Sequence, residues 1–131
     1  MLNQQSADEI ANHWINAWNS RDIMQIMAHY ADNIEFTSPF INTLTLCTEG
    51  KIYGKPALQA YFLKGLANFP ELNFELLQAL PGMTSVTLLY KSINNLLAAE
   101  VMEIDSEGKI YSVLAHYSET ANLKIRTQLC E

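Results

Sequence analysis

Glu100 is the most distinctive candidate for chemistry, because it is the one acidic residue inside the apolar run Leu96–Met102. A carboxyl surrounded by apolar side chains loses hydration when it ionises, so its pKa rises and its neutral form can donate a hydrogen bond. Such a group can act as an acid or hold a ligand's oxygen. The alternatives are a carboxylate satisfied by Lys91 or a tyrosine, and a carboxylate that faces solvent.

Tyr90 is the second candidate, at the end of the run Val86–Tyr90. A buried tyrosine usually needs a partner for its hydroxyl, and Glu100 would serve. The turn at Asn94-Asn95 decides whether Tyr90 lies beside Glu100 or faces away from it. We predict that Glu100 and Tyr90 are the catalytic residues, and an ordinary core tyrosine is the alternative for Tyr90.

Other reactive patterns are missing from the sequence. The histidines His13, His29 and His116 show no metal-ligand spacing, and the five glycines stand apart instead of forming a phosphate-binding loop. Cys47 and Cys130 lie far apart and fit no Cys-x-x-Cys pattern, so they predict neither a disulfide framework nor a zinc site. We therefore expect no metal and no cofactor.

Composition narrows the class of protein. The chain has 131 residues, 49% apolar and 17% charged, which suits a single domain over residues 1–131 with a real core. Fourteen acidic against eight basic residues give a formal charge of −6, which argues against nucleic acid and anionic membranes as partners. No apolar run approaches the roughly 20 residues that span a bilayer. We expect a soluble, reduced, cytoplasmic protein.

The first half of the chain reads as helices. Ser6 and Glu9 form a predicted capping box at the start of the first helix. Apolar residues then recur at helical spacing in three stripes, one for each expected helix. The stripes are Ile10, Trp14, Ala17 and Trp18; Ile23, Ile26, Met27 and Tyr30; and Leu58, Phe62 and Leu66, the last between Gly54-Lys55-Pro56 and Phe69-Pro70.

The second half reads as strands. Asn33–Ser38 alternates, with Ile34, Phe36 and Ser38 on one face, and Thr43–Tyr53 reads as a loop with one short strand. Four further strands separated by turn signals predict an antiparallel meander: Leu72–Leu80, Ser85–Lys91, Leu97–Ile104 and Lys109–Tyr117. A hairpin at Gly108 would place Glu100 opposite Val113, on the face of Ala98 and Ala115.

These elements predict an α+β fold in which three N-terminal helices pack on a strongly curved, mainly antiparallel sheet and leave a cone-shaped cavity. Side chains on its inner surface would bind a ligand, namely Trp14, Trp18, Tyr30, Phe36, Ser38, Phe62, Val113 and Ala115. On the other face of the last strands we place Ile110, Leu114 and His116, and this uncovered face predicts a homodimer.

The order of elements resembles the nuclear transport factor 2-like superfamily, and within it the SnoaL-like, polyketide cyclase-like group. The likeness covers about residues 8–118 and is carried by four segments: Trp14–Asp22, His29–Pro39, Gly54–Leu58 and Asp105–Ile110. It implies the fold. It does not imply one activity, because the same cone hosts isomerases, cyclases, dehydratases, epoxide hydrolases and proteins without chemistry.

The resemblance also implies roles for single positions. Ketosteroid isomerases carry a basic aspartate where this chain has Ser38, and a neutral, hydrogen-bonding aspartate where it has Glu100. Their tyrosine donor in the first helix corresponds to Trp14, and a supporting tyrosine corresponds to Tyr30. Limonene epoxide hydrolases and several cyclases carry an acid where this chain has Ala115. The oxygen-stabilising half of the isomerase site is thus retained and the base is absent.

We therefore predict a domain that binds a small apolar or aromatic molecule in the cone. Any turnover would be cofactor-free acid/base isomerisation, cyclisation or dehydration of a carbonyl compound. The alternative is a ligand-binding or protein-interaction module of the same fold without turnover. The absence of an acid at Ser38 and Ala115 favours the module, whereas Glu100 together with Tyr90 or Tyr30 favours the enzyme.

Overall fold

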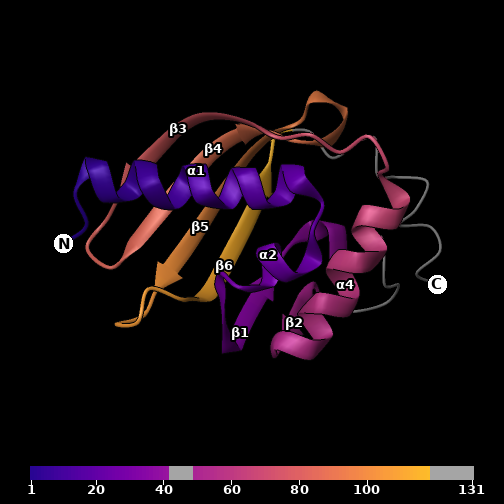
Figure 1. Cartoon of the computed structure of the whole chain (residues 1–131), viewed down its shortest axis with the longest axis horizontal. Helices are drawn as coiled ribbons and strands as arrows, with labels where there is room; N and C mark the ends of the chain where they lie inside the picture. Colours follow the sequence, from indigo (N-terminus) through magenta and orange to yellow (C-terminus); the bar gives the residue numbers. More distant parts are fainter. Residues whose placement is uncertain (42–48, 119–131) are drawn as a thin grey trace.

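A computed structural model describes residues 1–41 and 49–118 and confirms the α+β class (Figure 1). The helices α1, α2 and α4 span Gln4–Ser20, Ile23–Met27 and Lys55–Asn68. The strands β1 to β6 span Tyr30–Thr37, Lys51–Tyr53, Glu75–Pro81, Ser85–Lys91, Leu97–Ile104 and Ile110–Tyr117, and a short 3₁₀ turn covers Ile93–Asn95. Cys47 and Cys130 lie outside the described residues.

One six-stranded sheet has the order β2-β1-β6-β5-β4-β3. The strands β3 to β6 form the predicted antiparallel meander, and the bounds of β4 and β5 agree with the sequence prediction. The pairing of β1 with β6 is parallel, so the sheet is mixed. Figure 1 shows α1 lying across one face of the curved sheet, with α2 and α4 near β1 and β2. The core therefore lies between this face and the helices.

Alternation along the strands separates the two faces of the sheet. The inner residues of β4 to β6 are buried, whereas the outer ones are partly or fully exposed. His116 lies on the outer face, as predicted, and Leu114 beside it is 46% exposed. The buried inner residues are Val86, Leu88, Tyr90, Ala98, Glu100, Met102, Val113 and Ala115.

The predicted capping box at Ser6 and Glu9 is wrong. The first helix begins three residues earlier, with Asn3 as its N-cap, and the Asn3 side chain accepts a hydrogen bond from the Ser6 backbone N–H at 2.8 Å. Asparagine is among the best N-cap residues, and the Leu2 N–H is already bonded to the Gly82 carbonyl. The backbone before the helix is therefore held in place, and the helix starts ahead of Ser6.

The predicted second helix is too long. It ends at Met27, and Tyr30 is the first residue of β1, paired with Ile110 of β6. Asp22 caps the start of this short helix by accepting hydrogen bonds from the Met24 and Gln25 N–H groups. Tyr30 continues the helical stripe only by coincidence, because an inward strand residue is apolar for the same reason as an inward helix residue.

The predicted register of the last hairpin is also wrong. Glu100 lies opposite Ala115, not Val113, because the loop has five residues and one extra residue bulges at the start of β6. These two changes shift the register by two residues, so Glu100 keeps the predicted face. The bulge turns Ile110 inward, where it is 1% exposed, so its predicted place beside Leu114 on the outer face is wrong.

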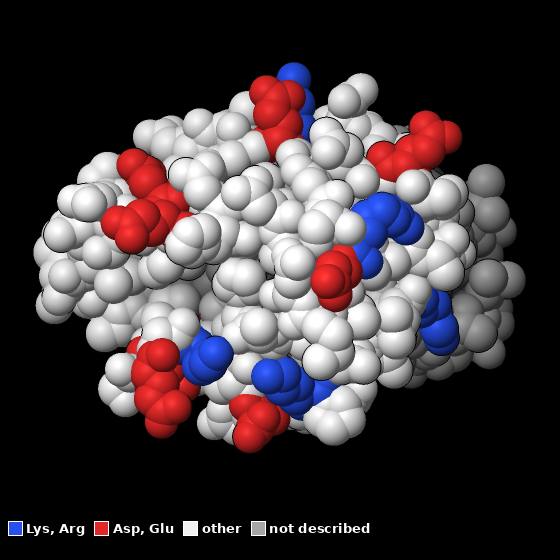
Figure 2. All heavy atoms as spheres, in the orientation of Figure 1, with Lys and Arg blue, Asp and Glu red and all other residues white. Residues whose placement is uncertain are grey.

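Charged side chains are scattered over the surface. Figure 2 shows Lys and Arg side chains placed among Asp and Glu on the face of α1, without a large area of one sign. Across residues 1–41 and 49–118, no helix is long and apolar enough to cross a membrane.

Candidate functional site

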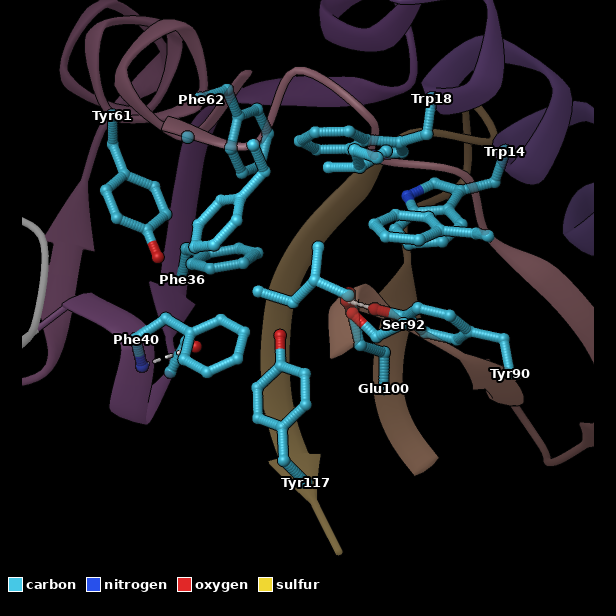
Figure 3. Close-up of a pocket in the computed structure, with 16 residues that line it drawn as sticks. Trp14, Trp18, Phe36, Phe40, Tyr61, Phe62, Tyr90, Ser92, Glu100 and Tyr117 are labelled. Atoms are coloured by element: carbon cyan, nitrogen blue, oxygen red, sulfur yellow. Dashed lines mark hydrogen bonds between the residues drawn. The ribbon is translucent and has the colours of Figure 1, made fainter. Parts of the chain in front are cut away.

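A cavity opens between the inner sheet face and the helices (Figure 3). The cavity has a volume of about 60 Å³. The whole empty space around it, which includes the mouth open to solvent, is about 520 Å³. The lining is strongly aromatic and consists of Trp14, Trp18, Phe36, Ser38, Phe40, Tyr61, Phe62, Gly65, Phe69, Leu72, Phe74, Tyr90, Ser92, Ile93, Glu100 and Tyr117. A small apolar or aromatic molecule is the chemical match for such a surface.

Glu100 and Tyr90 meet on neighbouring strands at one side of this cavity. Glu100 lies opposite Leu88 on β4, and Tyr90 lies one inward position further along that strand. The Tyr90 hydroxyl donates to Glu100 Oε1 at 2.5 Å. The turn at Asn94-Asn95 thus places Tyr90 beside Glu100, one of the two arrangements that the sequence left open.

The second carboxyl oxygen, Glu100 Oε2, is buried and has no hydrogen-bond partner among the described residues. Burial raises the Glu100 pKa to about 7, against a smaller lowering by the Tyr90 hydroxyl. Both forms of the carboxyl are therefore populated near neutral pH. Figure 3 shows it directed into the space between the aromatic rings. An unpartnered buried polar atom in a cavity is unusual and favours a ligand or a water there.

Aromatic rings fix the wall beside this pair. The Trp14 ring packs edge-on against Tyr90 at 5.3 Å and stacks on Phe74 at 5.8 Å. Trp14 Nε1 donates to the Tyr30 hydroxyl at 3.0 Å, and burial raises the Tyr30 pKa well above its usual value. Trp18 Nε1 is buried and has no partner at hydrogen-bond distance among the described residues, although it lies near enough to lower the Tyr30 pKa.

Hydroxyl groups line the cavity from Tyr117, which interacts with Tyr90, to Tyr61 and Ser38 on the other side. Ser38, directly after β1, is 2% exposed, and its Oγ accepts from the Phe40 N–H at 3.2 Å. Tyr61 of α4 and Tyr117 of β6 interact with this serine, and Tyr117 stacks on Phe40 with 4.1 Å between ring centres. Burial raises the pKa of both tyrosines, so their hydroxyls stay protonated at neutral pH.

The structure brings most of the predicted site residues together. Trp14, Trp18, Phe36, Ser38, Phe62, Tyr90 and Glu100 all line the cavity. The other predicted ligand-binding residues, Tyr30, Val113 and Ala115, are buried but do not line it.

Several lining residues were missed from the sequence, above all Phe40, Tyr61, Phe74 and Tyr117. The period of two that places Val113 and Ala115 inward also places Tyr117 there, so this residue could have been found.

No cluster of three or more histidine, cysteine, aspartate or glutamate residues that could hold a metal occurs within 1–41 and 49–118. Glu100 is the only carboxyl among the described lining residues. Proton transfer and hydrogen bonding are therefore what this arrangement of residues can supply by itself.

Solved structures share this fold. A SnoaL-like protein of unknown function from Burkholderia thailandensis is 34% identical, with a TM-score of 0.85 over 91% of this chain and 100% of its own. A proposed isomerase of the SnoaL-like family from Agrobacterium tumefaciens is 17% identical, with a TM-score of 0.69 over 86% and 97%. The epoxide hydrolase/cyclase-like enzyme SalBIII, linked to pyran ring formation in salinomycin, is 20% identical, with a TM-score of 0.71 over 92% and 96%.

Sequence comparison gives the family directly. A search of functionally curated proteins gave no significant match. The sequence profile of the SnoaL-like domain, in contrast, matches residues 11–113, most of the helices and nearly the whole sheet. The chain therefore belongs to the SnoaL-like domain family.

Proposed function

We propose that the cavity binds a small apolar or aromatic carbonyl compound and that Glu100 holds its oxygen. The observation that carries this proposal is the buried, unpartnered Glu100 Oε2 in an aromatic cavity. In the neutral carboxyl, Oε1 accepts from Tyr90, so the proton on Oε2 is free to be donated to a ligand. A ketone or aldehyde oxygen, which only accepts hydrogen bonds, is the complementary group.

The same group can supply acid/base catalysis without a cofactor. A catalytic acid or base works best when its pKa lies near the working pH, and the Glu100 pKa of about 7 meets this condition. The ionised form can accept a proton from the carbon next to the carbonyl, and the neutral carboxyl that results can return this proton to carbon or to the carbonyl oxygen. Isomerisation, cyclisation and dehydration of a carbonyl compound all need such proton transfers. The isomerase and cyclase-like descriptions of two structural neighbours are compatible with this proposal.

Acetophenone is a suitable probe, because it is a neutral aromatic ketone with no titrating group. We expect its affinity to fall about tenfold for each pH unit above 7, because only neutral Glu100 donates to its oxygen. Titration calorimetry between about pH 6 and pH 9 measures this fall. Glu100→Gln, which keeps a donor but cannot ionise, should bind equally at all these pH values. An affinity independent of pH in the wild type would contradict the proposal.

Turnover is tested by the exchange of the methyl hydrogens of acetophenone for deuterium, followed by NMR in heavy water. We expect the wild type to accelerate this exchange and Glu100→Gln to lose about a hundredfold or more of the rate. Glu103→Gln, on the same strand but outside the cavity and bonded to Tyr111, is the matched control and should keep the rate. Binding without exchange would instead support a ligand-binding module.

We also propose that the chain forms a homodimer through the outer sheet face. On this face Val101 lies beside Leu114, and Leu97 is 43% exposed. Light scattering at micromolar concentration should give twice the monomer mass, and Leu114→Glu should give the monomer because it places a charge in the apolar contact. Met24→Glu, at a position 70% exposed on α2, is the control. A monomeric wild type would contradict the proposal.

The scattered charges and the excess of acid lead us to propose that nucleic acid is not a partner of this chain.

A further inference from the structure

The hydroxyls of Ser38, Tyr61 and Tyr117 are not used in the function proposed above. All three side chains line the cavity that contains Glu100. The Ser38 Oγ accepts from the Phe40 N–H, and its own proton can be donated to Tyr61, to Tyr117 or to a ligand. Figure 3 shows the Tyr61 and Tyr117 hydroxyls turned toward the inside of the cavity from α4 and from β6. A mostly aromatic surface thus carries three hydroxyls besides that of Tyr90.

Ser38 and Tyr61 lie on the side of the cavity away from Glu100, whereas the Tyr117 hydroxyl lies between the two sides and interacts with both Ser38 and Tyr90. Ser38 follows β1 and Glu100 lies on β5, with β6 between these two strands. Adjacent strands are about 4.8 Å apart, so two spacings separate the backbones of β1 and β5 by roughly 10 Å. Figure 3 likewise places Tyr61 and Phe40 on one side and Tyr90 with Glu100 on the other. The rings of Phe36, Phe62 and Trp18 lie near the space between them.

We infer that Ser38 and Tyr61 form a second hydrogen-bonding site, with the Tyr117 hydroxyl between this site and Glu100, so that the cavity takes a ring compound with two oxygen functions at opposite ends. This inference rests on the proposed function, because it assumes that Glu100 binds the first oxygen. A single aromatic ring with oxygens on opposite carbons has a suitable length. Glu100 binds the carbonyl end, and Ser38 and Tyr61 bind a hydroxyl or a second carbonyl.

The fixed positions of the three side chains suit recognition better than proton abstraction. Tyr117 is held by its stacking on Phe40, and Tyr61 by ring contacts with Phe36 and Phe62. Burial keeps both phenols protonated, and a serine hydroxyl without a base does not remove a proton from carbon. Preorganised donors in a desolvated site discriminate strongly against a ligand that lacks the matching oxygen, because the buried donors then stay unpaired.

Two matched probes test this inference, namely acetophenone with one oxygen and 4-hydroxyacetophenone with a second oxygen on the opposite ring carbon. At about pH 6 the wild type should bind the hydroxylated ketone about tenfold more tightly, the effect of one hydrogen bond in a buried site. Tyr61→Phe keeps the ring and should reduce this preference. The double variant Tyr61→Phe/Ser38→Ala should abolish it.

Tyr111→Phe is the control, because the Tyr111 hydroxyl donates to Glu103 outside the cavity, and its preference should equal that of the wild type. Equal affinities for the two ketones in the wild type, or a preference that persists in the double variant Tyr61→Phe/Ser38→Ala, would overturn the second site. If acetophenone still shows the pH dependence expected from Glu100, the first site stands. Failure of both ketones to bind at millimolar concentration would overturn both proposals.

Discussion

Glu100→Gln should make the protein more stable than the wild type at pH 8 and leave its stability almost unchanged below pH 5. The Glu100 pKa rises from 4.5 to about 7 on folding, because burial penalises the charged carboxylate. The folded state therefore holds the proton more tightly than the unfolded state. The stability that neutral Glu100 contributes is present below pH 4.5 and is lost as the pH rises to about 7.

The size of this loss follows from the pKa shift, at 1.36 kcal/mol per unit. It amounts to roughly 3 kcal/mol, a large fraction of the stability of a domain of this size. Urea unfolding at several pH values measures it as the difference between the wild type and Glu100→Gln. Glu9→Gln removes an exposed carboxyl from α1 and should follow the wild-type curve. Parallel curves for the wild type and Glu100→Gln across pH 5 to 8 would show that Glu100 is not a buried neutral acid.

The sequence was sufficient to find this group because its signal is local. One acidic residue in an apolar strand, in alternation with Ala98 and Met102, must either face inward or interrupt a buried surface. The bounds of β4 and β5 were predictable for a similar reason, since turn residues flank both strands. The predicted inward direction of Glu100 was correct although the predicted register was wrong, because a shift of the register by an even number of residues keeps every side chain on its face.

Other features depend on contacts between distant segments and leave no such local signal. The bulge at the start of β6 lies where the Ile110 N–H donates to the His29 carbonyl at 2.9 Å, beside the pairing of Ile110 with Tyr30 of β1. Phe40 was missed because its position depends on a contact with Tyr117, which comes 77 residues later in the chain. The two ring centres are 4.1 Å apart. Tyr30 was placed in a helix because the same apolar side chain suits the inner face of a helix or of a strand.

The aromatic wall shows how the core and the candidate site depend on the same residues. Asn19, at the end of α1, binds the Phe74 backbone on both its N–H and its C=O, at 2.7 and 2.9 Å. Because of these bonds, β3 begins at Glu75 and not at the predicted Leu72. They also hold Phe74 against Trp14, so the aromatic wall beside Tyr90 is preorganised for a ligand.

Trp14→Ala should therefore destabilise the fold more than any other substitution considered. Trp14 is 1% exposed, and its loss would remove the ring contacts with Phe74 and Tyr90 and leave a large void. Replacing a buried tryptophan by alanine costs about 3–5 kcal/mol. Chemical denaturation should show this loss, and Leu63→Ala, at a position 45% exposed on α4, should change stability by less than about 1 kcal/mol.

Trp14→Phe separates the ring from its polar N–H. Phenylalanine keeps most of the packing but cannot donate to the buried Tyr30 hydroxyl, which then loses the partner it has at 3.0 Å. An unsatisfied buried group costs about 1–3 kcal/mol, so this variant should lie between the wild type and Trp14→Ala. The double variant Trp14→Phe/Tyr30→Phe should recover part of that loss, because neither polar group remains. If Trp14→Phe were as stable as the wild type, the bond from Trp14 to Tyr30 would contribute nothing to the fold.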